Sequence, residues 1–245
     1  MPASSGLSLH SVDVASSSSD LAWQAATEGA PSGTAFLVGE QTAGRGRRGA
    51  AWSSARGGMY LSVLLRPQVP PSAYFGLSFV AALAIRAELA ARLPACDVML
   101  KWPNDVLVGA GKICGILLEA RGDAVVIGTG VNITPVAPLA AGRMPAISVH
   151  ECGGGNVMPR DLAESYGRNL LARVESYAQT GFAAIRLDWL RHCAHIGGQM
   201  RVSTGADIVE GYFADLDTDG ALVLRDDAGQ DRRVTTGDVE LMGRP

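Results

Sequence analysis

Cysteine is scarce in this sequence, and the cysteines that are present are scattered. None of the four lies in a Cys-x-x-Cys pair, which excludes a zinc ribbon and argues against a disulfide framework; they are Cys96, Cys114, Cys152 and Cys193. The spacing of two histidines at positions 192 and 195 suits a metal on a helix, but no second pair of ligands stands near them in the sequence. We therefore expect reduced thiols and no metal at this histidine pair.

Long apolar runs are also missing. No stretch of about 18 consecutive apolar residues occurs, which excludes a membrane-spanning helix. The N-terminus has neither the basic segment nor the apolar core of a secretory signal. The sequence therefore predicts a cytoplasmic protein without a membrane partner, and it leaves the oligomeric state open, a homodimer included.

Charge is sparse as well. Only 18% of the 245 residues are charged, and the net charge is −3. A protein that wraps nucleic acid is expected to carry a basic balance, so no DNA partner is expected. Hydrophobic residues make up 47%, which is typical of a globular protein. A chain of this length buries roughly 70–75% of its unfolded surface, enough for one large domain or for a large domain with a small one.

The basic residues that do occur gather in one segment. Residues 41–49 read Gln-Thr-Ala-Gly-Arg-Gly-Arg-Arg-Gly, and Trp52 follows them. We call residues 41–52 the arginine loop. Glycines let backbone N–H groups approach phosphate oxygens, and guanidinium groups bind carboxylate or phosphate through two parallel hydrogen bonds. Taken alone, such a run is as often a solvated face or a nucleic-acid patch.

Three further stretches hold polar residues that suit chemistry. Residues 101–105 read Lys-Trp-Pro-Asn-Asp, residues 111–119 read Gly-Lys-Ile-Cys-Gly-Ile-Leu-Leu-Glu, and residues 128–132 read Gly-Thr-Gly-Val-Asn. Together with the arginine loop, and in this order and spacing, they resemble the catalytic core of biotin protein ligases. The resemblance covers most of residues 7–134.

The resemblance implies an α+β fold. Residues 1–197 would form a catalytic domain with a mixed or antiparallel sheet flanked by helices, as in class II aminoacyl-tRNA synthetases, and residues 198–245 a small SH3-like β-barrel. It implies two steps: ATP, with Mg²⁺, activates biotin as biotinyl-5′-AMP, and biotin then passes to a lysine of a biotin carboxyl carrier protein, such as that of acetyl-CoA carboxylase. Because few residues precede position 7, we expect a short form without the N-terminal DNA-binding domain of some relatives.

Cationic side chains are expected to carry the first step, because bringing a carboxylate to a triphosphate opposes like charges. The expected catalytic residues are Lys112, Arg45, Arg47 and Arg48, and Lys112 would bridge the biotin carboxylate and the α-phosphate. The residues expected to bind biotin are Ser18, Ser19, Gln41, Gly44, Arg45, Arg47, Lys112, Gly128 and Gly130. Those expected to bind ATP are Arg47, Arg48, Trp52, Asn104, Asp105, Lys112 and Asn132.

Two of these expectations leave alternative roles open. Asn104 and Asp105 offer hard oxygens, which suit Mg²⁺ or the polar groups of the nucleotide. Trp52 would either stack on adenine or anchor the loop by its own burial.

One stretch departs from the family pattern. Biotin ligases carry an Asp-Ser-Thr-Asn signature that contacts biotin, and the matching residues here are Ser17, Ser18, Ser19 and Asp20. The hydroxyl pair at Ser18 and Ser19 is kept, while the roles of the two flanking positions stay open. Ser19 or Asp20 is also placed to cap a helix over residues 21–28.

Hydrophobic periodicity and breakers predict the remaining elements. Helices are expected over residues 72–93, 159–177 and 182–195. Strands are expected over residues 7–14, 34–40, 59–65, 98–102, 105–108, 113–120 and 124–133, and, in the C-terminal barrel, over residues 199–204, 207–215, 221–225 and 232–235. Residues 1–6 are expected to be loose, and residues 134–144 to form a loop.

Three other functions compete with biotin ligation. Lipoate or octanoate ligases and transferases share the fold, but their Arg-Arg-x-Ser-Gly-Gly-Gly stretch is absent. A nucleic-acid-binding module could use the arginine loop with the barrel, which the acidic C-terminal segment opposes. An inactive relative that only binds biotin is disfavoured by the intact Lys112.

Overall fold

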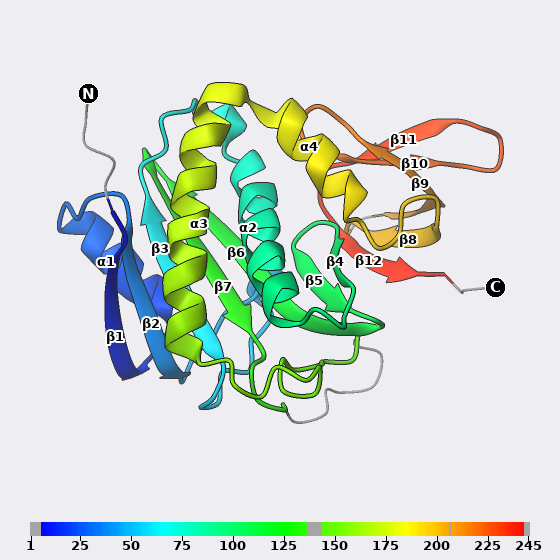
Figure 1. Cartoon of the computed structure of the whole chain (residues 1–245). Helices are drawn as coiled ribbons and strands as arrows, with labels where there is room; N and C mark the ends of the chain where they lie inside the picture. The colour runs from blue at the N-terminus through cyan, green and yellow to red at the C-terminus, as the bar shows by residue number, and fades with distance from the viewer. Residues whose placement is uncertain (1–5, 137–143, 206, 243–245) are drawn as a thin grey trace.

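A seven-stranded sheet forms the centre of the larger part of the molecule (Figure 1). The computed structural model describes residues 6–136, 144–205 and 207–242. The strand order is β1-β2-β3-β7-β6-β5-β4. β1 runs parallel to β2 and every other neighbouring pair is antiparallel. The strands are β1 (Ser8–Ala15), β2 (Thr34–Gln41), β3 (Met59–Leu65), β4 (Val98–Lys101), β5 (Asp105–Val108), β6 (Gly111–Arg121) and β7 (Ala124–Val131).

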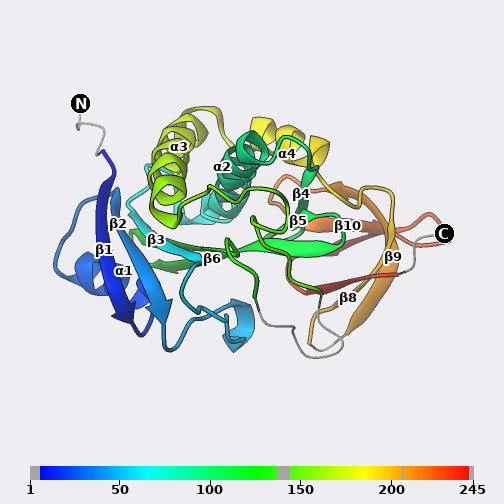
Figure 2. The same cartoon turned by 60° about the horizontal axis from the view of Figure 1, so that its bottom comes forward.

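Helices cover the two faces of this sheet unequally. α2 (Gly76–Arg92), α3 (Pro159–Thr180) and α4 (Phe182–Arg191) lie on one side, and α1 (Ser18–Thr27) lies on the other (Figure 2). Side chains alternate along β3, so Leu61 and Val63 belong to the main core while Leu64 packs with Trp23 of α1. The face beside α1 is therefore only partly covered, and polar residues of the strands can reach a ligand there.

A second sheet follows α4. It is antiparallel, with the order β11-β10-β9-β8-β12, and its strands are β8 (Gln199–Ser203), β9 (Ile208–Leu216), β10 (Leu222–Arg225), β11 (Asp231–Val234) and β12 (Asp238–Leu241). Edge-to-face contacts of Phe79 with Trp189 and Phe182 join α2 to α4 beside this sheet. The indole N–H of Trp102 donates to the carbonyl of Gly220 at 3.1 Å, which ties the second sheet to the first.

Most predicted elements are confirmed to within two residues at each end, and five differ more. α3 ends at Thr180, three residues beyond the predicted end. α1 begins at Ser18, and Ser17 rather than Ser19 or Asp20 caps it. α2 begins at Gly76, because a separate 3-10 turn, Pro71–Ala73, precedes it. α4 ends at Arg191, four residues before the predicted end. β12 was not predicted.

Some expectations concern parts of the chain that the structure leaves undescribed. The predicted loose segment 1–6 and the predicted loop 134–144 lie largely outside the described residues. Within the described residues, no helix combines the length and the apolarity needed to cross a membrane.

Candidate functional site

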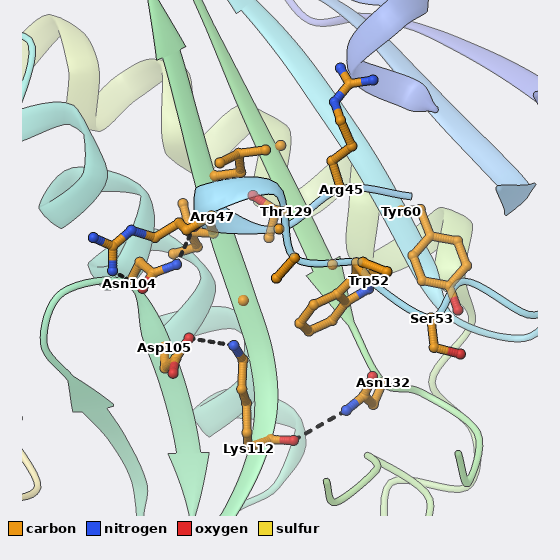
Figure 3. A pocket seen from close by; sticks show the side chains of 18 of the residues that line it. Arg45, Arg47, Trp52, Ser53, Tyr60, Asn104, Asp105, Lys112, Thr129 and Asn132 are labelled. Atoms are coloured by element: carbon orange, nitrogen blue, oxygen red, sulfur yellow. Dashed lines mark hydrogen bonds and ion pairs between the residues drawn. The ribbon is translucent and has the colours of Figure 1, made fainter. Parts of the chain in front are cut away.

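A cavity of about 530 Å³ opens on the α1 side of the central sheet. It lies between the start of α1, the arginine loop, β5 to β7 and residues 237–239 of the second sheet (Figure 3). Twelve of the predicted site residues line it: Ser18, Ser19, Gln41, Arg45, Arg47, Trp52, Asn104, Asp105, Lys112, Gly128, Gly130 and Asn132. Residues up to 114 positions apart in sequence therefore share one cavity.

Hydroxyl and amide groups of Ser18, Ser19 and Gln41 form the polar wall of this cavity. Ser17 is the N-cap of α1, because its Oγ accepts from the backbone N–H groups of Ser19 and Asp20. Ser62 of β3 lies 2.8 Å from Ser18 Oγ and 3.1 Å from Ser19 Oγ. Gln41 accepts from Ser18 N at 2.8 Å through its Oε1. These neutral donors and acceptors are held in fixed positions by one another.

Two lysines and one carboxylate form a cationic wall. Lys112 Nζ lies 2.5 Å from Asp105 Oδ1, and Lys101 Nζ lies 3.7 Å from Asp105 Oδ2. Lys101 is buried, and burial lowers its pKa, which the nearby charge of Lys112 lowers further and Asp105 opposes. Because one carboxylate serves two ammonium groups, this wall keeps a surplus of positive charge.

Arg47 adds to that surplus. Its guanidinium donates to Asn104 Oδ1 at 3.3 Å, to Thr236 Oγ1 at 3.2 Å and to the carbonyl of Gly237. Within the part of the chain that the structure describes, no carboxylate forms an ion pair with it; burial lowers the pKa of Arg47, and the charges of Asp238 and Asp105 partly oppose that shift. A half-buried guanidinium with neutral partners favours an anion beside it.

Trp52 lies over the sheet where two glycines face each other across β6 and β7. A Cβ on Gly130 would stand 2.6 Å from Trp52 Nε1, and one on Gly115 would stand 2.8 Å from Trp52 Cζ3. The Lys112 ammonium lies 5.1 Å from the centre of the Trp52 ring. Trp52 Nε1 is buried and has no hydrogen-bond partner among the described residues. The two glycines thus leave room for the indole, a packing that the burial alternative for Trp52 requires.

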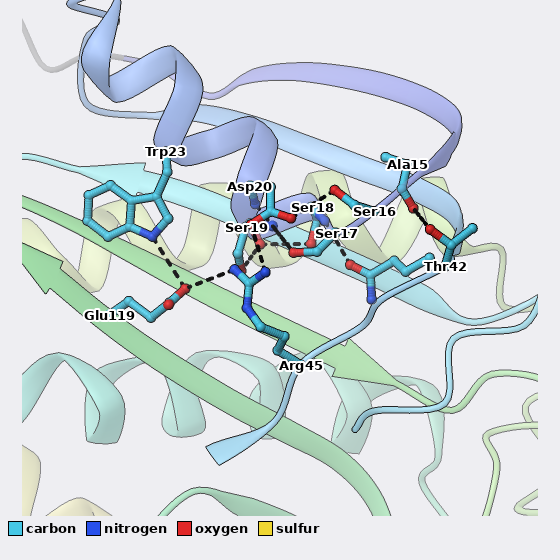
Figure 4. Close-up of polar contacts among 12 residues, drawn as sticks. Ala15, Ser16, Ser17, Ser18, Ser19, Asp20, Trp23, Thr42, Arg45 and Glu119 are labelled. Carbon is cyan, nitrogen blue, oxygen red and sulfur yellow. Dashed lines mark hydrogen bonds and ion pairs between the residues drawn. The ribbon is translucent and has the colours of Figure 1, made fainter. Parts of the chain in front are cut away.

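Three predicted site residues have other neighbours. Arg45 points away from Lys112 and Asp105 (Figure 3) and reaches Asp20 at 2.7 Å and Glu119 at 3.9 Å (Figure 4). Arg48 does not line the cavity; it donates to Asp238 and to the carbonyls of residues 203 and 204. Gly44 does not line it either, because its backbone pairs with that of Trp52.

The pair predicted to hold magnesium also has other partners. Asn104 donates to the Ile116 carbonyl at 2.6 Å and accepts from Arg47, while Asp105 lies between Lys101 and Lys112. A divalent cation would meet three positive groups there, so these side chains as they stand do not fit a magnesium ion. Asn132 donates to the carbonyls of Lys112 and Ile147 and braces β6.

Several residues of the site were not predicted. Ser62 links the two predicted serines, Tyr60 and Thr129 line the cavity, and Gly237, Asp238 and Val239 bring the second sheet to its rim. A serine inside an otherwise apolar strand was the one signal for Ser62. No local pattern indicated that residues 237–239 would meet the arginine loop.

The chain was compared with known protein families and structures. Residues 12–132 match the model of the biotin/lipoate A/B protein ligase family, and residues 195–242 match that of the biotin protein ligase C-terminal domain. A biotin–[acetyl-CoA-carboxylase] ligase of Paracoccus denitrificans is 40% identical over 213 residues, which cover 81% of this chain and 87% of that protein. The ligase of the same name from Mycobacterium tuberculosis is 35% identical over 230 residues, covering 91% and 85%.

The structural comparison agrees with these matches. The biotin protein ligase of Aquifex aeolicus, solved in complex with biotin and ATP, has the same fold, with a TM-score of 0.83 at 22% identity over 96% of this chain and 98% of that one. The predicted α+β architecture with a small C-terminal SH3-like sheet is thereby confirmed. Sequence and fold together place the chain among the biotin protein ligases, within the biotin/lipoate A/B protein ligase family.

Proposed function

We propose that this chain is an ATP-dependent biotin–[biotin carboxyl carrier protein] ligase. The observation that carries the proposal is the contrast between the two walls of the cavity. Ser18, Ser19 and Gln41 offer neutral donors and acceptors that suit the ureido ring of biotin. Lys112 and Arg47 offer positive charge that suits its carboxylate and the phosphates of ATP.

In the first step, a carboxylate oxygen of biotin attacks the α-phosphorus of ATP, and the bond to the β-phosphate oxygen breaks. Pyrophosphate leaves, and biotinyl-5′-AMP remains. Lys112 would stand between the two anions and offset the charge that develops as they meet. Arg47 would hold the phosphate and close the arginine loop over the adenylate.

In the second step, the amine of a carrier lysine attacks the acyl carbon of the mixed anhydride. The new amide bond forms as AMP leaves with the electrons of the broken C–O bond, and the amine loses a proton. The names of the relatives support a carrier of the acetyl-CoA carboxylase type as acceptor. We place the reaction in the cytoplasm, in a catalytic unit of residues 1–197 with a second unit of residues 198–245. No step is assigned to a magnesium ion on Asn104 and Asp105.

Exchange of labelled pyrophosphate into ATP tests the first step. Biotin should support exchange, and lipoate or octanoate at the same concentration should not, because the dithiolane ring of lipoate and the alkyl chain of octanoate lack the ureido donors and acceptors that match the serine and glutamine wall. Exchange with lipoate alone would assign the chain to the lipoate branch. Exchange with none of the three acids, together with DNA binding that weakens steeply with salt, would favour the nucleic-acid module instead.

A further inference from the structure

Two of the four cysteines lie next to each other, and neither lines the cavity described above. Cys96 follows the end of α2, and Cys152 lies in the turn that follows residue 148. They are 56 residues apart in sequence, and the Cys96 thiol donates to the Cys152 carbonyl at 3.6 Å. Burial, together with the charge and a hydrogen bond of the neighbouring Cys96 thiol, raises the pKa of the Cys152 thiol to about 11.

The surroundings hold the two thiols together but leave them accessible. Both residues are half-buried, whereas Cys114 and Cys193 are buried. Leu93 contacts both segments. Its carbonyl accepts from Cys96 N, and its side chain packs against Gly154 so closely that a Cβ on Gly154 would lie 2.8 Å from it. Cys96 and Cys152 are therefore more exposed than the other two cysteines and are the better candidates for attack on a small oxidant.

The turn that carries Cys152 also supports the cavity. Just before it, Ile147 N donates to the carbonyl of Lys112, and the Asn132 side chain donates to the carbonyl of Ile147. Val149 N donates to the carbonyl of Asn132 at 2.8 Å. A covalent link at Cys152 would thus fix the segment that backs Lys112 and Asn132.

We propose that Cys96 and Cys152 are an oxidant-responsive pair that forms a reversible disulfide with a disulfide oxidant such as oxidised glutathione. One protein thiolate attacks glutathione disulfide and expels a glutathione thiolate. The other attacks the protein sulfur of the mixed disulfide and expels the second glutathione. The protein thiols lose two electrons and two protons, and the oxidant is reduced to two glutathione thiols.

The link staples the turn at residues 148–154 to the end of α2 without moving the cavity walls, because the segments it joins already touch. Amide hydrogen exchange at Ile147 and Val149 should slow in the oxidised protein. Closing a loop of this length restricts the unfolded chain, so the melting temperature should rise by about 5 °C.

The test uses the whole protein, equilibrated with glutathione and glutathione disulfide, quenched with acid and alkylated. Trypsin should yield residues 93–101 disulfide-linked to residues 144–160, and dithiothreitol should release them. Cys96→Ser and Cys152→Ser should each show a glutathione adduct on the remaining cysteine, no linked peptide and no rise in melting temperature. Cys114 and Cys193 are the unreactive reference thiols.

Two results would overturn the proposal: separate glutathione adducts on Cys96 and Cys152 of the wild-type protein without the linked peptide, or a linked peptide that involves Cys114 or Cys193. The pairing of these thiols does not depend on which acid the cavity binds. A failure of the pyrophosphate exchange assay would therefore leave this result unaffected.

Discussion

Asp105 forms ion pairs with the ammonium groups of both Lys101 and Lys112. Lys112 can therefore bind an incoming anion without leaving Asp105 unpaired. Both lysines line the cavity, but Lys101 is buried, while Lys112 is more exposed and lies against the Trp52 ring. When an anion enters, Lys112 can bind it while Lys101 keeps Asp105 paired. The two lysines thus have different roles although they share one carboxylate.

Lys112→Ala should lower the rate of pyrophosphate exchange by ~10²–10³, about 3 kcal/mol, because it removes a cation aimed at charge that develops in the transition state. The fold should survive, since Asp105 keeps Lys101 as a partner. The measurement is exchange at saturating biotin and ATP, with circular dichroism as the check on folding. A variant that exchanges at nearly the wild-type rate would remove Lys112 from the reaction.

Gly130 has no side chain, and the Trp52 indole occupies the space that a side chain there would fill. Gly130→Ala would force a methyl group to within 2.6 Å of Trp52 Nε1, and such overpacking costs about 1–3 kcal/mol. The arginine loop should then leave its seat more often, and trypsin should cut it roughly tenfold faster after Arg47 and Arg48. Gly155→Ala is the matched control, because nothing lies within 4 Å of a Cβ there. Equal cleavage of the two variants would show that Trp52 does not anchor the loop.

At the scale of elements, the local sequence pattern was sufficient to predict an element whose own residues and flanking residues mark where it begins and ends. β3 and β5 have the predicted bounds, since each is an apolar run with a glycine or a proline within two residues of each end. β12 has four residues, Asp-Val-Glu-Leu, whose polar and apolar side chains alternate as in a strand, but the pattern is short and was not predicted to form one, and the partner strand β8 lies far away in the sequence. The arginine loop was found from its composition, but the directions of Arg45 and Arg48 depend on Asp20, Glu119 and Asp238, which only the folded chain brings near.

Ser17 and Asp20, the two residues that depart from the family signature, have contacts of their own at this scale. Ser17 takes the capping role at the start of α1, and Asp20 binds Arg45 and accepts from Ser16. The N-terminal end of the arginine loop is thereby tied to α1, and its C-terminal end to the second sheet through Arg47 and Arg48. Among the residues that the structure describes, Arg45 and Arg48 form ion pairs with carboxylates and Arg47 forms none, so the three arginines are not equivalent.

Arg47→Gly should still make biotinyl-adenylate, because Lys112 remains, but should release it ten- to a hundredfold faster. Loss of one charged contact of ~1.5–3 kcal/mol accounts for that range. Released adenylate should label lysines of a bystander protein. Arg45→Ala removes an equal charge from the same loop, but partly exposed carboxylates already pair with that charge. This variant should therefore change the rate of adenylate release no more than a few-fold. If the lysines of a bystander protein that is present in excess stay unlabelled, Arg47 does not retain the adenylate.

At the scale of the whole molecule, the second sheet completes the cavity. Residues 237–239 line its rim, and Thr236 and Asp238 bind Arg47 and Arg48. A separate contact also positions the sheet, where Gly220 lies against Phe75 and Phe79 near the Trp102 hydrogen bond. A change at Gly220 should therefore alter the arginine loop without touching any residue of the cavity.

Gly220→Ala and Gly229→Ala separate this coupling from simple backbone strain. Both glycines have φ of +77°, so alanine costs about 1 kcal/mol of strain at either position. Only at Gly220 would the new Cβ also meet Phe79 at 2.8 Å and Phe75 at 3.0 Å, while nothing lies within 4 Å at Gly229. Both variants should melt a few degrees lower than the wild type, and only Gly220→Ala should speed the release of biotinyl-adenylate, by about tenfold, with bystander labelling as the readout. Equal release from the two variants would mean that the second sheet does not hold the arginine loop closed.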